Sequence, residues 1–141
     1  MRLDNILTWL HVTGNLIWIG AILAVGLVLL SPQGDAKVRG ELGKRIYLYA
    51  ATPGFLVSFL FGMSRLLMDP KHYFVETHWM HGKLLFALIF IGLHHVIGAR
   101  AKKMASGAVA DAGPTRGLLI GMLVCAVGAT FFALVLSATG M

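Results

Sequence analysis

Four long apolar segments, separated by short clusters of helix-breaking and charged residues, constrain this chain more than any other feature of its sequence. The segments cover about residues 6–30, 46–68, 79–97 and 118–138. An α-helix of about 20 apolar residues crosses the roughly 30 Å hydrocarbon core of a bilayer. We therefore expect one all-α domain over residues 1–141, a four-helix transmembrane bundle of up-and-down topology with the lipid bilayer as its partner.

The composition agrees with a membrane location. Hydrophobic residues make up 57% of the chain and charged residues 13%, and the mean hydropathy is +0.79. The net charge of +6 is compatible with nucleic-acid binding, but the basic residues gather in two loops beside apolar segments, so we expect no nucleic-acid partner. The lone cysteine, Cys125, excludes an internal disulfide and a cysteine-based metal cluster.

The distribution of basic residues predicts the orientation, because cytoplasmic loops of membrane proteins carry an excess of Lys and Arg. One side of the predicted bundle holds Lys37, Arg39, Lys44, Arg45, Arg100, Lys102, Lys103 and Arg116, and the other holds Arg2, Arg65, Lys71 and Lys83. This asymmetry predicts both termini on the non-cytoplasmic side. We expect the protein to lie in a bacterial inner membrane, so that both termini would be periplasmic. Gly- and Ala-rich helix surfaces in so small a bundle also predict a homo-oligomer.

Polar residues inside the apolar segments are the candidates for chemistry, because such residues are costly in a bilayer. In the first segment Thr8, His11, Asn15 and Trp18 recur at helical spacing and share one face. In the third segment the face that carries Trp79, Lys83, Phe90 and His94 lies roughly opposite the one that carries His81 and His95. Both faces cannot point fully into the bundle centre.

A neutral imidazole is a good iron ligand, and facing helices can hold a haem between them. By depth in the membrane, His11 pairs with His81, although Lys83 competes with His81 for the inward face. Met63 is another candidate for the sixth ligand, and Lys83 and Arg65 are placed to neutralise carboxylates such as porphyrin propionates.

Structural interpretations of the same residues stay open. His11 can serve only as a hydrogen-bonding residue inside a packed bundle. Lys83 can extend its amino group outward to the membrane surface, and Trp79 can be an interfacial anchor. His94 can be a capping residue at the cytoplasmic end of its helix, which is followed by the basic residues that determine the membrane orientation.

Motifs in the first three segments resemble the HemJ-type protoporphyrinogen oxidase family of small helical membrane proteins. They are Leu10-His11 with Ile17-Trp18-Ile19-Gly20, then Lys44-Arg45-Ile46-Tyr47 with Pro53 and Gly62, and finally Trp79-Met80-His81-Gly82-Lys83-Leu84 followed by Leu93-His94. The resemblance covers about residues 9–100, and the Trp-x-His-x-Lys pattern is its most specific part.

The resemblance implies a haem b cofactor and oxidation of protoporphyrinogen IX, with electrons passed to a membrane acceptor such as a quinone. It favours His11 as a haem ligand and makes Lys83 and His94 candidates for catalytic contacts to the porphyrin. Trp18 and Trp79 lie within the matching motifs and are further candidates for cofactor contact, together with Arg65 and Lys83.

The chain departs from the family pattern in two places. Where the family has an Arg-containing stretch that ends in His, this chain has residues 25–32, which contain neither residue. The last segment also lacks the family's Asn-Glu-x-Pro opening. Two alternatives therefore stay beside the oxidase: a haem-binding electron-transfer or haem-handling protein without turnover, and a copper-handling or transporter-like four-span protein.

Overall fold

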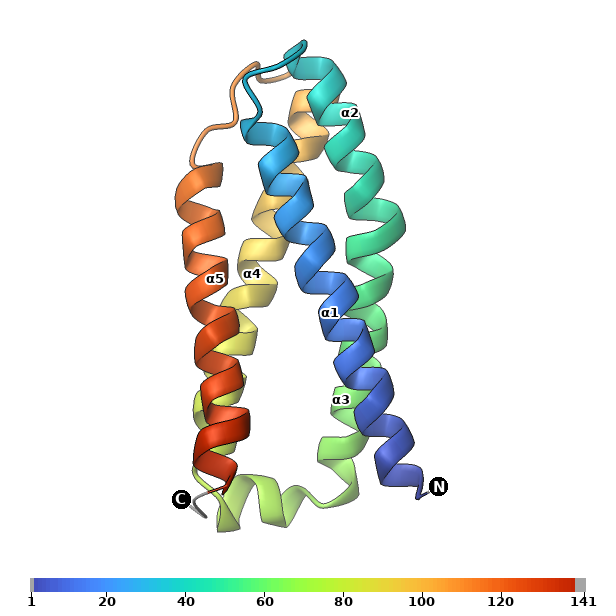
Figure 1. Ribbon diagram of the computed structural model, residues 1–141, viewed down its shortest axis with the longest axis vertical. Helices are drawn as coiled ribbons and strands as arrows, with labels where there is room; N and C mark the ends of the chain where they lie inside the picture. The colour runs from blue at the N-terminus through green and yellow to red at the C-terminus, as the bar shows by residue number, and fades with distance from the viewer. Residues whose placement is uncertain (1, 139–141) are drawn as a thin grey trace.

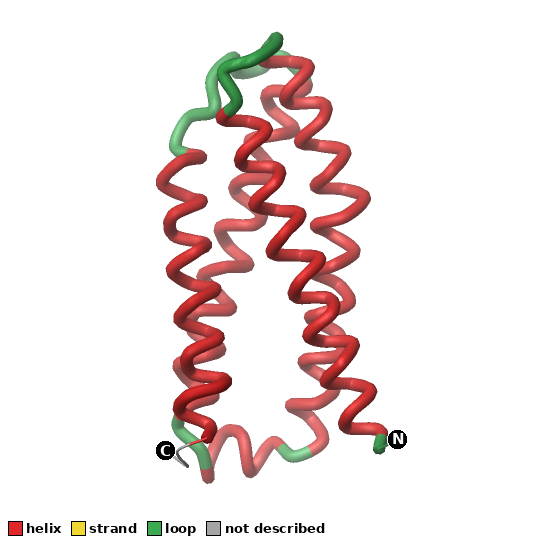
Figure 2. The backbone as a smooth tube through the Cα atoms, viewed as in Figure 1, coloured by secondary structure: helices red, strands yellow, loops and turns green. Residues whose placement is uncertain are grey.

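The computed structural model describes residues 2–138, and this part of the chain is helical except for short connections (Figures 1 and 2). Its elements are α1 (Leu3–Leu30), α2 (Ala36–Ile46), η1 (Tyr47–Ala51), α3 (Thr52–Met68), η2 (His72–Glu76), α4 (Trp79–Ala105), α5 (Thr115–Phe131) and η3 (Phe132–Leu136). The three η elements are short π-helical turns.

Four continuous helical segments are long and apolar enough to cross a membrane. They are Leu3–Leu30, Ala36–Met68, Trp79–Ala105 and Thr115–Leu136. The prediction of an all-helical chain with four candidate spans is therefore confirmed. Large apolar side chains on the outer faces, such as Leu16, Leu88 and Val127, are exposed, as expected for a surface that lipid covers.

The second helical segment is longer than the sequence pattern indicates. We expect it to begin near Ile46, but in the structure the helix begins at Ala36, where the Asp35 side chain accepts a hydrogen bond from the Lys37 backbone N–H. Such an N-cap starts a helix without apolar residues. Just before Pro53 the helix widens into the π-helical turn η1. The Thr52 hydroxyl, directly after this turn, donates a hydrogen bond to the Tyr47 carbonyl.

The helices alternate in direction, and the connections gather at the two ends of the bundle (Figure 1). The connections from α1 to α2 and from α4 to α5 lie at one end. The eight basic residues within 37–45 and 100–116 belong to these connections and the helix ends beside them. The start of α1, the η2 segment and the end of η3 lie at the other end. We call these the basic end and the terminal end.

Small residues bring α1 and α3 close together. Gly54, Ser58 and Gly62 recur every four residues along the face of α3 that meets α1. A Cβ atom on Gly54 would lie 2.7 Å from the backbone nitrogen of Trp18, and one on Gly14 would meet the Ser58 backbone. This spacing of small residues is typical of closely packed membrane helices.

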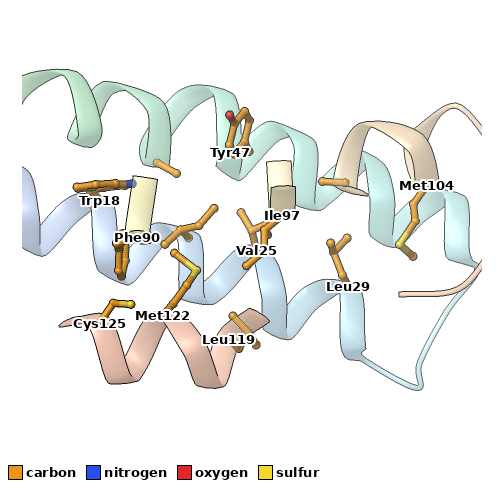
Figure 3. Packing of buried hydrophobic residues seen from close by; sticks show 13 residues of the cluster. Trp18, Val25, Leu29, Tyr47, Phe90, Ile97, Met104, Leu119, Met122 and Cys125 are labelled. Atoms are coloured by element: carbon orange, nitrogen blue, oxygen red, sulfur yellow. The ribbon is translucent and has the colours of Figure 1, made fainter. Parts of the chain in front are cut away.

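Figure 3 shows the packing of the buried hydrophobic core. The residue numbers of this core place most of it in the half of the bundle nearest the basic end. This core contains Trp18, Ile22, Val25, Leu29, Tyr47, Ala51, Phe90, Ile97, Ala101, Met104, Leu119, Met122 and Cys125. Toward the terminal end, Leu66 and Met80 are the buried hydrophobic residues of the segments around η2. The polar candidates His11, Arg65 and Lys83 lie in this second half.

We expect Gly54→Ala to destabilise the bundle. The added methyl group meets the Trp18 backbone, which cannot move aside as a flexible side chain can, so the helices must separate at a cost of about 1–3 kcal/mol. Thermal unfolding in detergent measures the loss. Gly20→Ala is the matched control, because nothing lies within 4 Å of the new methyl group; equal stability of the two variants would contradict the packing described.

Candidate functional site

His11 lies at the contact between α1 and α3, and both of its ring nitrogens have partners. Nδ1 lies 2.7 Å from the Ser58 carbonyl oxygen and 3.3 Å from the Ser58 hydroxyl. Nε2 lies 3.1 Å from the amide nitrogen of Asn15, one turn further along α1. The polar stripe predicted on the first helix thus faces α3 at His11 and Asn15.

The partners of His11 define its tautomer. A carbonyl oxygen only accepts hydrogen bonds, so Nδ1 carries the proton and donates it to Ser58. Nε2 of the neutral ring therefore bears the lone pair and accepts from Asn15. Metal-binding histidines very commonly donate one ring N–H to a backbone carbonyl and bind the metal through the other nitrogen. His11 has this arrangement.

Gly62 gives the His11 ring its room. A Cβ atom at Gly62 would lie 2.7 Å from both Cε1 and Nδ1 of His11. The ring therefore packs directly on the α3 backbone, at the third small residue of the spacing that brings the two helices together. The position of the imidazole depends on the same helix contact that supplies its hydrogen-bond acceptor.

Arg65 and Lys83 lie close enough to His11 for their charges to act on its ring. The Arg65 guanidinium is paired with Asp4 at 2.9 Å. Lys83 is half-buried, and its Nζ lies 5.9 Å from the centroid of the Trp79 ring, a cation–π distance. Within residues 2–138, no carboxylate is paired with Lys83. The structure thus brings together His11, Arg65 and Lys83 from three different helices.

His94 lies in the packed half of the bundle and is 0% exposed. The Trp18 indole N–H donates to its Nδ1 at 3.1 Å, and its ring stacks on Tyr47 with 4.8 Å between centroids. The Tyr47 hydroxyl in turn lies 3.3 Å from Nδ1 of His95. Trp18 and His94, predicted on separate helices as candidate site residues, therefore contact each other directly.

The tautomer of His94 is the opposite of that of His11. Because an indole N–H only donates, His94 Nδ1 must accept, and the neutral ring carries its proton on Nε2. That Nε2 is buried and has no hydrogen-bond partner among the described residues. A protonated ring nitrogen has no lone pair for iron, so His94 in this state offers a hydrogen-bond donor and not a metal ligand.

The structure does not bring His81 to His11. The His81 side chain is exposed, and its ring contacts are with Phe74 and His78, at 6.3 Å and 6.5 Å between centroids. No hydrogen bond or ring contact joins it to His11 in the described part of the chain. Met63 is half-buried and follows Gly62 on α3. Residues 2–138 also hold no group of three or more His, Cys, Asp or Glu residues that could bind a metal ion.

Ser58 and Tyr47 are the site residues that sequence reasoning missed. Ser58 is 2% exposed and contacts His11 through its carbonyl and its hydroxyl. The four-residue spacing of Gly54, Ser58 and Gly62 was the available signal, because it marks a face on which another helix packs closely. Nothing in the sequence indicates that Tyr47 stacks on His94.

Comparison with known proteins gives one distant similarity. A curated protein of Synechocystis sp., "Protoporphyrinogen IX oxidase", is 27% identical over 108 residues, a match that covers 69% of this chain and 50% of that protein. The chain thus spans about half the length of the curated relative it matches. No family model matches the chain, and no solved structure does. The similarity gives distant support to the family resemblance noted in the motifs.

We expect Trp18→Phe to destabilise the protein through His94. The change keeps an aromatic ring in the core but removes the donor to His94 Nδ1, which is then buried without a partner at a cost of about 1–3 kcal/mol. Thermal unfolding measures the effect. Trp9→Phe is the control, because Trp9 is 63% exposed; if both variants unfold at the temperature of the unmodified protein, the hydrogen bond contributes nothing to stability.

Proposed function

We propose that this chain is a haem b-containing membrane oxidoreductase that oxidises protoporphyrinogen IX to protoporphyrin IX and passes the electrons to a membrane acceptor such as a quinone. The observation that carries the proposal is the 2.7 Å contact between His11 Nδ1 and the Ser58 carbonyl oxygen, which assigns the ring proton to Nδ1. The lone pair on Nε2 suits an axial haem ligand. The similarity to the Synechocystis protein supplies the substrate class.

The residues around His11 include the chemical groups that a haem needs: a neutral imidazole nitrogen for iron, and the cations Arg65 and Lys83 for propionates. His11 would bind the iron through Nε2, with Met63 or His81 as candidates for a second ligand, and a bound haem would supply one-electron redox chemistry. His81 would have to move inward to take this role, since its side chain is exposed. Met63 is half-buried and follows Gly62, the residue of α3 on which the His11 ring packs.

Lys83 is the residue best suited to bind a carboxylate of the porphyrin or porphyrinogen. Both molecules carry propionate groups, and a cation in a low-dielectric site binds them strongly. Arg65 is already paired with Asp4, whereas no described carboxylate pairs with Lys83. The Lys83 amino group lies 5.9 Å from the centroid of the Trp79 ring. Lys83 would therefore hold the substrate or haem carboxylate, with Arg65 adding positive charge.

His94 supports the site by positioning, in this proposal. Its Nδ1 holds the Trp18 indole, and Trp18 lies two turns along α1 from His11. This hydrogen bond joins α1 to α4. The buried Nε2–H has no partner among the described residues, so His94 retains one donor. The terminal end of the bundle, with His11 and Lys83, would face the periplasm, because the excess of basic residues lies at the opposite end.

A haem-binding protein without enzymatic turnover is the second candidate, and one observation favours it. In the region where the family pattern has Arg and His, this chain instead places Val25 and Leu29, which are 0% and 1% exposed in the hydrophobic core. These two side chains pack in the core and supply no charge to a substrate. The same haem scaffold would then serve electron transfer or haem handling, in a homo-oligomer or with another membrane partner.

We expect the detergent-purified protein to show a b-type haem spectrum after reduction with dithionite, and His11→Ala to lose it. Loss of the imidazole removes the axial ligand, so hemin added to the variant should not restore the spectrum. His72→Ala is the control, because His72 is an exposed residue near Glu76 at the end of the bundle. A colourless unmodified protein that stays colourless with added hemin would overturn the haem proposal.

Complementation of a bacterial strain that lacks protoporphyrinogen oxidase separates the enzyme from the haem carrier. We expect the unmodified chain to restore growth and Lys83→Met to abolish it, since the variant keeps the length of the side chain but loses its charge. Lys71→Met should retain activity, because Lys71 lies at the exposed end of the bundle and pairs with Glu76. A well-expressed, haem-loaded protein that fails to complement would identify the non-enzymatic candidate.

A further inference from the structure

His11, Asn15 and Ser58 form a closed ring of hydrogen bonds between α1 and α3. His11 Nδ1–H donates to the Ser58 carbonyl at 2.7 Å, and the Ser58 hydroxyl donates to Asn15 Oδ1 at 2.7 Å. The Asn15 amide nitrogen completes the ring by donating to His11 Nε2 at 3.1 Å. Each residue is both donor and acceptor in the ring.

The ring defines which way the Asn15 amide points. If the amide were reversed, its oxygen would face the lone pair on His11 Nε2, and its NH₂ group would face the Ser58 hydroxyl. Two acceptors facing each other repel, so the orientation with the NH₂ group on Nε2 is favoured. In the protein without a ligand, the one lone pair of His11 is therefore occupied by a neighbouring side chain.

We propose that Asn15 is an intramolecular competitor for the iron-binding nitrogen of His11. This inference rests on the proposed function, in which His11 Nε2 ligates a haem. Iron and the Asn15 amide cannot share the same lone pair, so Asn15 must turn away before the ligand binds. Asn15 has a short side chain on α1, and a change of rotamer releases it without movement of the helix.

A competitor of this kind lowers affinity in a defined way. The binding-competent state is the fraction of molecules in which Asn15 has released Nε2, and the apparent affinity falls by that fraction. The competition acts before binding, so it slows association and leaves dissociation of the bound haem unchanged. A residue that only stabilised the fold would not separate the two rates in this way.

The test measures hemin binding to the apoprotein in detergent. Asn15→Leu removes the amide but keeps the size of the side chain, and we expect hemin to bind about three- to tenfold more tightly, the range of one net hydrogen bond. The gain in affinity should come from faster association. The dissociation rate, measured as hemin transfer to an excess of apomyoglobin, should not change. Thr13→Val is the matched control, because it removes a polar group from α1 at a residue outside the ring.

Ser58→Ala provides a second variant if leucine is poorly accommodated. It removes the hydroxyl that holds Asn15 but keeps the carbonyl that holds His11 Nδ1, so we expect a smaller gain in the same direction. Circular dichroism and size-exclusion chromatography establish that both variants are folded. If both fold and neither speeds association, the inference is wrong.

The remaining outcomes separate this inference from the function on which it rests. If His11→Ala binds hemin as tightly as the unmodified protein, His11 is not the ligand, and the proposed haem site itself fails. If His11→Ala loses binding but Asn15→Leu binds hemin with unchanged or weaker affinity, the haem site stands and the competitor role of Asn15 is overturned. Tighter binding that comes from slower dissociation would also contradict the inference, and so would an equal gain in Thr13→Val.

Discussion

The hydrogen bond from His11 to the backbone carbonyl of Ser58 is the interaction on which the candidate site depends. It exists because α1 and α3 approach closely along Gly54, Ser58 and Gly62, which lets an imidazole on one helix reach the main chain of the other. A helix carbonyl is normally used by its own helix, and a second donor at that oxygen needs close helix packing. The small residues therefore determine the chemistry of His11 as well as the strength of the helix contact.

The bundle divides into two halves with different tasks. Near the basic end, Ile22, Val25, Ile97 and Met122 form a dense apolar core, and the one histidine in this half that is fully buried, His94, is held by an indole donor. Near the terminal end fewer side chains are buried, and Arg65 on α3 and Lys83 on α4 lie in the same half of the bundle as His11. The two imidazoles thus have opposite tautomers: Nε2 carries a proton in His94 and a lone pair in His11. Iron binding suits the second and not the first.

Much of the fold follows from the sequence, because hydropathy and length specify the spans almost without tertiary information. The same is true of the polar face with His11 and Asn15, which follows from helical spacing. The start of the second helix at Ala36 was missed because Asp35 caps a polar segment that hydropathy ignores. The role of Ser58 was missed for another reason: its carbonyl is the acceptor, and a sequence does not encode which main-chain oxygen a side chain will reach. The pairing of His11 with His81 followed from depth alone, and depth says nothing about the outward direction that His81 takes.

In the proposed haem site, His11 would bind the iron through Nε2 while the Ser58 carbonyl holds Nδ1. The most direct measurement is electron–nuclear double resonance on the ferric, haem-loaded protein produced with isotopically labelled histidine. The result expected is a strong coupling from an imidazole nitrogen that disappears in His11→Ala, with a second, weaker coupling from the remote nitrogen that carries the proton. An iron signal with no histidine coupling, or a coupling that persists in His11→Ala, would contradict the assignment of His11 as the ligand.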